Sequence, residues 1–167
     1  MIFLGIGSNL PSEFGDRFKN IELAISFLQK IEIKIIKKSS YYESFSYPNK
    51  NDPKFINIII SVETDLEPMA LMRNLILIEE KLGRKRNKKN DPRTCDIDII
   101  DYHKKVLQFK KNDLELTIPH KGAVFRNFVL FPLREICPDW KHPVTKKNID
   151  ILINELNINN NEITKLS

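Results

Sequence analysis

Residues 92–100 read PRTCDIDII, and from Asp96 onward acidic and apolar side chains alternate. Alternation with a period of two predicts a half-buried β-strand. Residues i and i+2 of a strand project from the same face, so Asp96 and Asp98 share one face and Ile97 and Ile99 share the other. This strand completes the order of segments that decides the fold.

Five segments precede this strand, and their apolar periodicity and turn residues define them. They are a strand at 2–6 that runs into a glycine-containing tight turn, a helix capped by Asp16, a strand at 31–42, a strand at 55–64, and a helix from Pro68 to a cap at Gly83. The polar stretch 44–53 predicts a loop between two of the strands.

The order βαββαβ is typical of the ferredoxin-like arrangement, in which helices cover one face of a mainly antiparallel sheet. The other face is then left for a ligand. Residues 106–109 predict a hairpin with the strand at 96–100, residues 124–136 a further helix, and the chain from Asn148 a last helix. We therefore expect a single α+β domain over 1–167, with an extra hairpin and C-terminal helices.

The composition fits a folded protein, with 41% hydrophobic and 29% charged residues in a chain of 167. It contains no apolar run of about 18 residues, so we expect no membrane partner. The first residues lack the basic start of a secretory signal, and Cys95 and Cys137 lack metal-ligand spacing. A cytoplasmic protein without structural zinc is expected. The net charge of +5 favours a phosphate-bearing partner, either nucleotide or nucleic acid.

The paired carboxylates of Asp96 and Asp98 suit Mg²⁺, which takes one or two protein carboxylates and completes its shell with water and phosphate oxygens. An isolated pair of this kind is more often two solvated acids on a strand edge. Arg84, Arg86 and Arg93 lie just upstream, and a guanidinium binds phosphate oxygens in a bidentate manner. Their presence favours a site for metal-bound phosphates.

Asn57 interrupts a hydrophobic strand, and burying an amide without partners costs about 1–3 kcal/mol. Its donor and acceptor complement the edge of a heterocycle that carries an amino and an oxo group, although bonding to the backbone of a neighbouring strand explains it equally well. Phe55 on the same face and Phe128 can stack on such a ring, or belong to the core. His120 and Arg126 add a further donor and a fixed cation.

Two classes of function are alternatives to an enzyme that transfers a phosphoryl-type group from a metal-bound nucleotide. A basic ferredoxin-like module can bind RNA or DNA, but the sequence lacks the aromatic RNP1 strand of such modules, so we expect no nucleic-acid partner. It also lacks the glycine-rich fingerprints of P-loop and dinucleotide-binding proteins. A metal-dependent nucleotidyltransferase using the two aspartates is the second alternative, and it would release pyrophosphate.

Five motifs occur in one order: GIGSNL at 5–10, FIN at 55–57, IEEKLGRKR at 78–86, PRTCDIDI at 92–99, and IPH followed by R-x-F at 118–128. Together they resemble the 6-hydroxymethyl-7,8-dihydropterin pyrophosphokinase family of folate synthesis. The resemblance implies transfer of a pyrophosphoryl group from ATP to the hydroxymethyl oxygen of the pterin. It also implies two Mg²⁺ ions and the release of AMP. We expect a monomer that can associate with other folate enzymes.

The resemblance also implies roles for single residues. Asp96 and Asp98 would bind both magnesium ions, and Arg84 and Arg93 would be catalytic. The implied pterin contacts are Ser44, Phe55, Asn57 and Phe128, and the implied contacts with ATP or the closing loop are Glu79, Arg86, Ile99, Thr117, His120 and Arg126.

The chain departs from the family pattern at several positions. Ser44 and Phe45 replace a usual Thr-Pro, the loop 87–91 lacks the usual aromatic and glycine, Lys121 replaces a common aromatic, and Glu115 stands where some relatives have arginine. Because the aspartates and their arginines are intact, we expect these differences to act on nucleotide affinity and loop closure rather than on the reaction.

Overall fold

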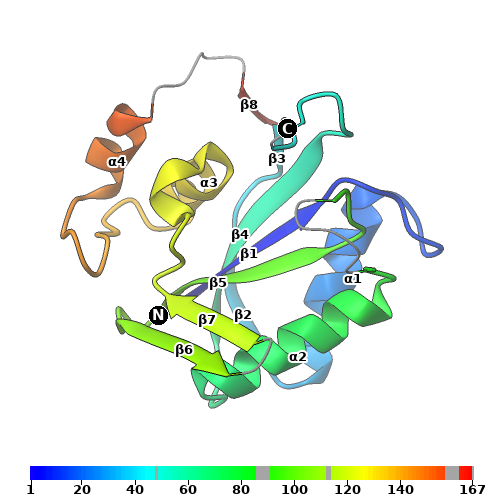
Figure 1. Cartoon of the computed structure of the whole chain (residues 1–167), viewed down its shortest axis with the longest axis horizontal. Helices are drawn as coiled ribbons and strands as arrows, with labels where there is room; N and C mark the ends of the chain where they lie inside the picture. Colours follow the sequence, from blue (N-terminus) through cyan, green and yellow to red (C-terminus); the bar gives the residue numbers. More distant parts are fainter. Residues whose placement is uncertain (48, 86–90, 112–113, 157–161, 167) are drawn as a thin grey trace.

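The structure, a computed structural model, describes residues 1–47, 49–85, 91–111, 114–156 and 162–166 (Figure 1). Its strands are β1 (Ile2–Ser8), β2 (Lys34–Lys38), β3 (Tyr42–Ser44), β4 (Phe55–Glu63), β5 (Asp96–Tyr102), β6 (Leu107–Lys111), β7 (Leu114–Ile118) and β8 (Ile163–Lys165). Its helices are α1 (Arg17–Lys30), α2 (Pro68–Lys81), the 3-10 turn η1 (Ala123–Phe125), α3 (Asn127–Ile136) and α4 (Ile149–Glu155).

In the described part of the chain, six strands form one sheet in the order β5-β1-β4-β3-β8, with β2 also beside β4. Strand β1 lies between β4 and β5 and is antiparallel to both, and β5 is outermost on its side. With α1 after β1 and α2 after β4, this is the split arrangement of a ferredoxin-like fold. The predicted fold class is confirmed.

One face of the sheet is packed against α1 and α2. Because side chains alternate along a strand, Ile2, Leu4 and Ile6 of β1 all enter this helix-side core. They meet residues such as Leu28 of α1 and Leu71 of α2, which are fully buried. This layer leaves the alternate residues of each strand on the other face.

The other face of the sheet is partly covered by helices, whereas the sequence predicted that all of it was open to a ligand. Phe3, Ile59 and Ile100 point to this side and form a second core with α3 and α4. Figure 1 shows these two helices on the side of the sheet away from α1 and α2. The buried Trp140 Nε1 donates a 2.8 Å hydrogen bond to Asp101, which fastens this layer to β5.

The strand expected at 31–42 is two strands, β2 and β3, which pair with successive parts of β4. Ser39 lies in the break and still bonds to Ile59, because its backbone and its hydroxyl satisfy the Ile59 carbonyl and amide at 2.9 and 3.0 Å. Apolar residues alternate along the start of the expected strand, and Ile33 is buried while Ile31 and Ile35 pack against the same helix-side core.

The expected hairpin between residues 106–109 and the strand at 96–100 is wrong. In the described residues β6 pairs with β7, and the two form a separate two-stranded sheet. The helix expected at 124–136 is divided into η1 and α3, because Arg126 is extended at φ −117° and ψ 110° and caps α3. Strand β8 was not predicted.

The helix ends follow local sequence signals. The Asp16 carboxylate accepts a 2.8 Å bond from the Lys19 amide, and Asn148 caps α4 in the same way at 2.9 Å. Gly83 follows α2 with φ +84°, the left-handed conformation that glycine adopts without strain. None of the helices that the structure describes has the length and apolar run needed to cross a bilayer.

The helix-side core gives a matched test on α2. Leu75 is 2% exposed and Leu77 is 53% exposed. We expect Leu75→Ala to lower the free energy of unfolding by about 2–5 kcal/mol, because it leaves a cavity, and Leu77→Ala by less than about 0.5 kcal/mol. Urea denaturation of both variants measures this, and equal losses would contradict the assignment of the two faces.

Candidate active site

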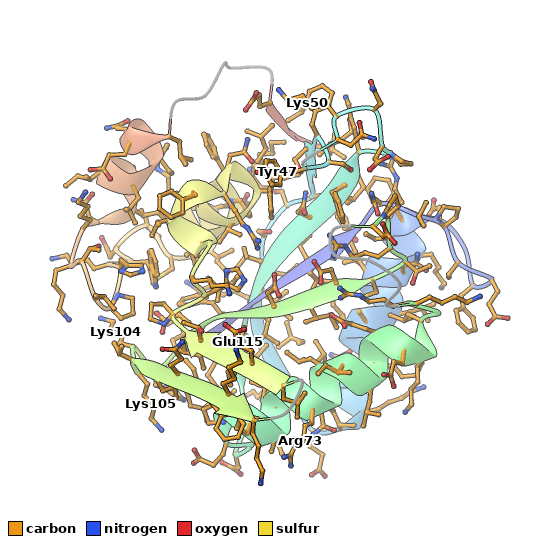
Figure 2. All side chains as sticks on the ribbon, viewed as in Figure 1. Tyr47, Lys50, Arg73, Lys104, Lys105 and Glu115 are labelled. Atoms are coloured by element: carbon orange, nitrogen blue, oxygen red, sulfur yellow. The ribbon has the colours of Figure 1, made fainter. Side chains whose placement is uncertain are left out.

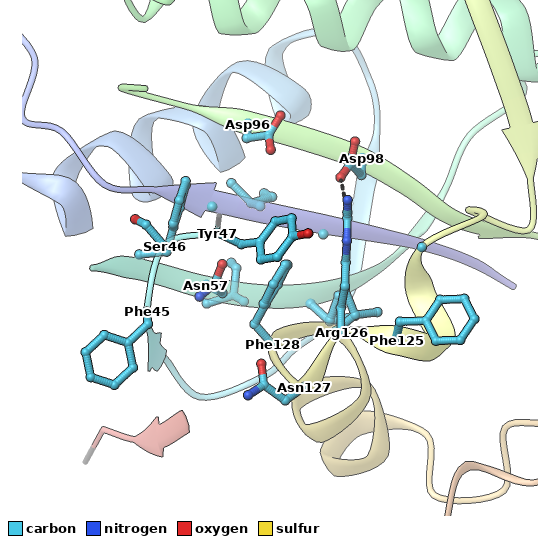
Figure 3. Close-up of a pocket in the computed structure, with 18 of the residues that line it drawn as sticks. Phe45, Ser46, Tyr47, Asn57, Asp96, Asp98, Phe125, Arg126, Asn127 and Phe128 are labelled. Atoms are coloured by element: carbon cyan, nitrogen blue, oxygen red, sulfur yellow. Dashed lines mark ion pairs between the residues drawn. The ribbon is translucent and has the colours of Figure 1, made fainter. Parts of the chain in front are cut away.

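A pocket of about 580 Å³ opens on the sheet face opposite α1 and α2, beside the part that α3 and α4 cover (Figure 3). Its walls come from β1, β4, β5, the loop 44–53 and the start of α3. Of the sequence-predicted site residues, the pocket wall contains Phe55, Asn57, Arg93, Asp96, Asp98, Arg126 and Phe128.

The floor of the pocket is set by the register of three strands. Gly7 of β1 lies opposite Asp96 of β5 on one side and opposite Asn57 of β4 on the other. Gly5 lies opposite Asp98 in the same way. The acidic pair and the amide therefore stand on one face, separated by a strand that carries no side chain between them.

The glycines were expected in a tight turn, but both lie within β1. A Cβ at Gly7 would come within 3.1 Å of Asn57 Oδ1, and one at Gly5 within 3.3 Å of the Ile100 side chain. Two glycines at i and i+2 in a strand allow another group to approach the backbone closely. Their spacing was the signal in the sequence for a ligand on this floor.

Asp96 is held by two arginines. Arg84 Nη1 lies 2.6 Å from one carboxylate oxygen, and Arg93 Nη1 lies 3.8 Å from the other. Burial acts to raise the pKa of Asp96, but Arg93 and Arg84 overcome it and hold that pKa below its ordinary value. Asp96 is therefore ionised. The Nε of Arg93 is buried without a hydrogen-bond partner among the described residues.

The negative charge of Asp98 is compensated less than that of Asp96. Arg126 Nη1 lies 3.5 Å away, as the dashed line in Figure 3 marks, and His120 Nε2 lies 3.7 Å away. Burial and the adjacent Asp96 carboxylate raise the pKa of Asp98 to about 7 despite Arg126. Burial and Arg126 lower the pKa of His120 to about 4, so this imidazole is neutral at pH 7 and adds no charge.

This imbalance fits a divalent cation. Two hard oxygen ligands stand on one face, and one of them lacks enough positive charge to ionise fully at neutral pH. A magnesium ion prefers such oxygens and uses only one or two protein carboxylates. The described residues hold no larger cluster of acidic, histidine and cysteine side chains that could hold a metal ion.

Glu79 reaches this site from the buried side of α2. It is 2% exposed, accepts a 2.7 Å bond from the Ile97 amide, and lies 2.7 Å from Arg84 Nη1. Arg84 thus bridges Glu79 and Asp96. Because Glu79 is closed off from solvent, its geometry suits positioning of Arg84 and β5 rather than contact with a nucleotide.

The other end of the pocket is aromatic. Phe55 lies with its ring centroid 5.4 Å from the Arg93 guanidinium, and Phe128 lies 5.6 Å from that of Arg126. Asn57 Nδ2 donates to Ser44 Oγ at 3.0 Å and to a backbone carbonyl at 3.3 Å. Asn57 therefore both lines the pocket and bonds to the neighbouring strand, and the buried Ser44 orients it.

Two further predicted nucleotide contacts have side chains outside the pocket wall. The Ile99 side chain belongs to the helix-side core and is 5% exposed, so only its backbone can meet a ligand. Thr117 is half-buried in β7, outside the pocket wall. Arg86 lies outside the described residues. Glu115 and Lys121, both departures from the family pattern, form an ion pair at 3.2 Å.

The sequence analysis missed residues of the loop 44–53 and of the segment after β1. Figure 3 shows Tyr47 and Phe128 pointing into the same space, and Tyr47 is 79% exposed. Asn9 links this loop to Arg93: its Nδ2 donates to Ser46 Oγ at 3.2 Å, and its Oδ1 accepts from the Arg93 amide at 2.7 Å. Tyr47 could have been found from the sequence, because an aromatic residue in an otherwise polar loop indicates a binding role.

The fold and the site thus define a ferredoxin-like protein whose pocket joins a cationic, carboxylate-bearing end to an aromatic end. The family model of 7,8-dihydro-6-hydroxymethylpterin-pyrophosphokinase (HPPK) matches residues 3–138. The chain belongs to this family.

Relatives agree with this assignment. The chain is 36% identical to 2-amino-4-hydroxy-6-hydroxymethyldihydropteridine pyrophosphokinase of Aquifex aeolicus, over 87% of this chain and 86% of that one. It is also 36% identical to the folic acid synthesis protein fol1 of Schizosaccharomyces pombe, over 92% of this chain, but it spans only about a fifth (20%) of that protein. The Plasmodium falciparum HPPK-DHPS crystal structure with pteroate matches with a TM-score of 0.78 at 16% identity, over 98% of this chain and 47% of that one.

The raised pKa of Asp98 predicts a pH-dependent stability. Its folded-state pKa of about 7 lies above the ordinary 3.8, so stability from this group is present below pH 3.8 and is lost as the pH rises through 7. The full shift corresponds to about 4 kcal/mol. Because the side chain is 36% exposed, water screens it, and we expect Asp98→Asn to stabilise the metal-free protein by about 1–2 kcal/mol at about pH 8.

Chemical denaturation with a chelator present, at about pH 8 and about pH 4, measures this difference, which should nearly vanish at the lower pH. The exposed Asp139 provides the control variant Asp139→Asn. A stabilisation by Asp98→Asn that is the same at both values of pH would contradict the assignment.

Proposed function

We propose that this protein transfers a pyrophosphoryl group from ATP to the hydroxymethyl group of 6-hydroxymethyl-7,8-dihydropterin. The hydroxymethyl oxygen loses its proton to solvent and bonds to the β-phosphorus, the bond from that phosphorus to the oxygen shared with the α-phosphate breaks, and AMP leaves. The observation that carries this proposal is the cross-strand row of Asp96, Gly7 and Asn57, in which an acidic residue suited to a metal-bound polyphosphate and an amide suited to a ring edge lie on two strands separated only by β1. Family membership supports the same substrates.

In this proposal Asp96 and Asp98 hold two magnesium ions, which when bound neutralise the ATP phosphates and polarise the transferred group. Arg84 and Arg93 bind the phosphate oxygens, and Glu79 keeps Arg84 in place. Catalysis then rests on positioning and electrostatic stabilisation rather than on a covalent intermediate. The unpartnered Nε of Arg93 is a donor suited to a phosphate oxygen.

At the aromatic end of the pocket, Asn57 hydrogen-bonds to the edge of the pterin that carries the amino and oxo groups, and Phe55 and Phe128 stack on its ring. Ser44 acts through Asn57. The nucleoside part of ATP lies toward His120, Arg126, Thr117 and the backbone of Ile99, and Arg86, which is outside the described residues, is a further ATP contact in this proposal. The neutral His120 serves as a hydrogen-bond donor or acceptor there.

We further propose that residues 1–167 form one catalytic unit that works in the cytoplasm as a monomer. Some relatives are longer, such as the P. falciparum protein named HPPK-DHPS. Association with another folate enzyme is therefore part of this proposal, whereas a nucleic-acid or membrane partner is not.

The decisive experiment is product analysis. Given ATP, magnesium and the reduced pterin, the protein should form AMP and the pyrophosphorylated pterin, and no pyrophosphate. Asp96→Asn and Asp98→Asn should each lower turnover by at least about a hundredfold, because each replaces a charged carboxylate ligand of the magnesium ions that bind the phosphates. Near-normal AMP formation by either variant, with Asp139→Asn as control, would refute the metal role.

The ring end gives a separate prediction. Asn57→Ala should raise the dissociation constant of the pterin at least about fivefold, because a polar partner is lost from a desolvated pocket. Ser44→Ala should have a smaller effect, since it removes only the group that orients Asn57. Calorimetric titration of the pterin measures both. An unchanged constant for Asn57→Ala, at an unchanged unfolding temperature, would place the ring elsewhere.

A further inference from the structure

The C-terminal segment 162–166 contains β8, which forms the edge of the sheet next to β3. Strand β8 pairs antiparallel with β3, with Ser44 opposite Ile163 and Tyr42 opposite Lys165. The Leu166 amide donates a 2.8 Å bond to the Tyr41 carbonyl, and Leu166 packs against the helix-side core. Figure 1 shows the end of the chain beside β3. The segment is therefore docked by its backbone.

The residue that precedes β8 reaches the loop 44–53. Lys50 Nζ lies 2.9 Å from Glu162 Oε1, and both residues belong to the pocket wall. Figure 2 shows Lys50 and Tyr47 near β8. Lys50 also lies 5.8 Å from the ring centroid of Phe45, another wall residue. Glu162 thus connects to the aromatic rim through Lys50.

The two ends of this loop are fixed by a different residue. Asn9 Nδ2 donates to Ser46 Oγ and to the Pro53 carbonyl, at 3.2 and 3.0 Å. The contact with Glu162 lies between these two points, at Lys50. The loop base is therefore held by Asn9, directly after β1, and its outer part is held by the C-terminal segment.

We propose that segment 162–166 is a positioning element of the substrate pocket. Through the Lys50–Glu162 ion pair it holds the outer part of loop 44–53, and so sets how Phe45 and Tyr47 stand at the rim. The affinity for the ring substrate then depends on a segment that lies outside the matched family region, residues 3–138. Only the identity of that ring as a pterin rests on the proposed function.

The size of the effect follows from the exposure of the pair. The Lys50 side chain is 66% exposed and that of Glu162 is 36% exposed, so water weakens their attraction. The β8–β3 ladder keeps Glu162 near the loop, which lowers the entropic cost of forming the pair. A change of about two- to fivefold in loop opening and in ring affinity is the scale to expect.

The test uses the full chain with Glu162→Gln, Lys50→Gln, and the swapped double variant Lys50→Glu with Glu162→Lys. Glu63→Gln is the matched control, because it removes the similar Lys34–Glu63 pair (3.5 Å), which joins β2 to β4. Hydrogen exchange of the loop 44–53 is measured without substrates. The KM values for the pterin and for ATP are measured separately.

Each single variant should raise loop exchange and the pterin KM about two- to fivefold, with the ATP KM and the unfolding temperature unchanged. The swap should restore both quantities, and Glu63→Gln should change neither. Unchanged loop exchange in both single variants, or an unchanged pterin KM, overturns the proposal. If exchange rises but wild type forms no AMP, the loop contact stands and the proposed function fails.

Discussion

The site depends on the repulsion between two carboxylates that one strand forces to face the same way. Asp96 is stabilised as an anion by Arg84 and Arg93, whereas burial and Asp96 itself raise the pKa of Asp98 to about 7. The protein supplies enough positive charge for one of the two acids. The remaining need for positive charge is what a divalent cation would meet. The closed position of Glu79 behind Arg84 keeps this arrangement in place.

The second constraint is the cross-strand register. Because β1 lies between β4 and β5, its glycines leave a shallow floor between the acids and Asn57. Side chains on sheet strands are placed more accurately than those on loops, so the distance between the two ends of the pocket is fixed by backbone hydrogen bonds. The loop 44–53 and the start of α3 then supply the aromatic walls, which can adjust.

The sequence predicted what depends on short-range patterns. The alternation in 96–100 gave the orientation of Asp96 and Asp98, and single residues such as Asp16 and Asn148 marked helix starts. Pairing between distant segments was not predictable in the same way. Local sequence does not show which strand β6 pairs with, because the choice of partner depends on tertiary packing, and the partner is β7. Strand β8 has three residues, which are too few to show an apolar period.

The position of β5 at the border of the sheet has a consequence for the shape of the bound ligand. Acids on an inner strand would confine a ligand to the area above the sheet. Acids on the outermost strand let an elongated molecule extend past the border, with one end above the central strands and the other near β7 and His120. Under the proposed function, ATP can extend past this border while the pterin occupies the floor over the inner strands.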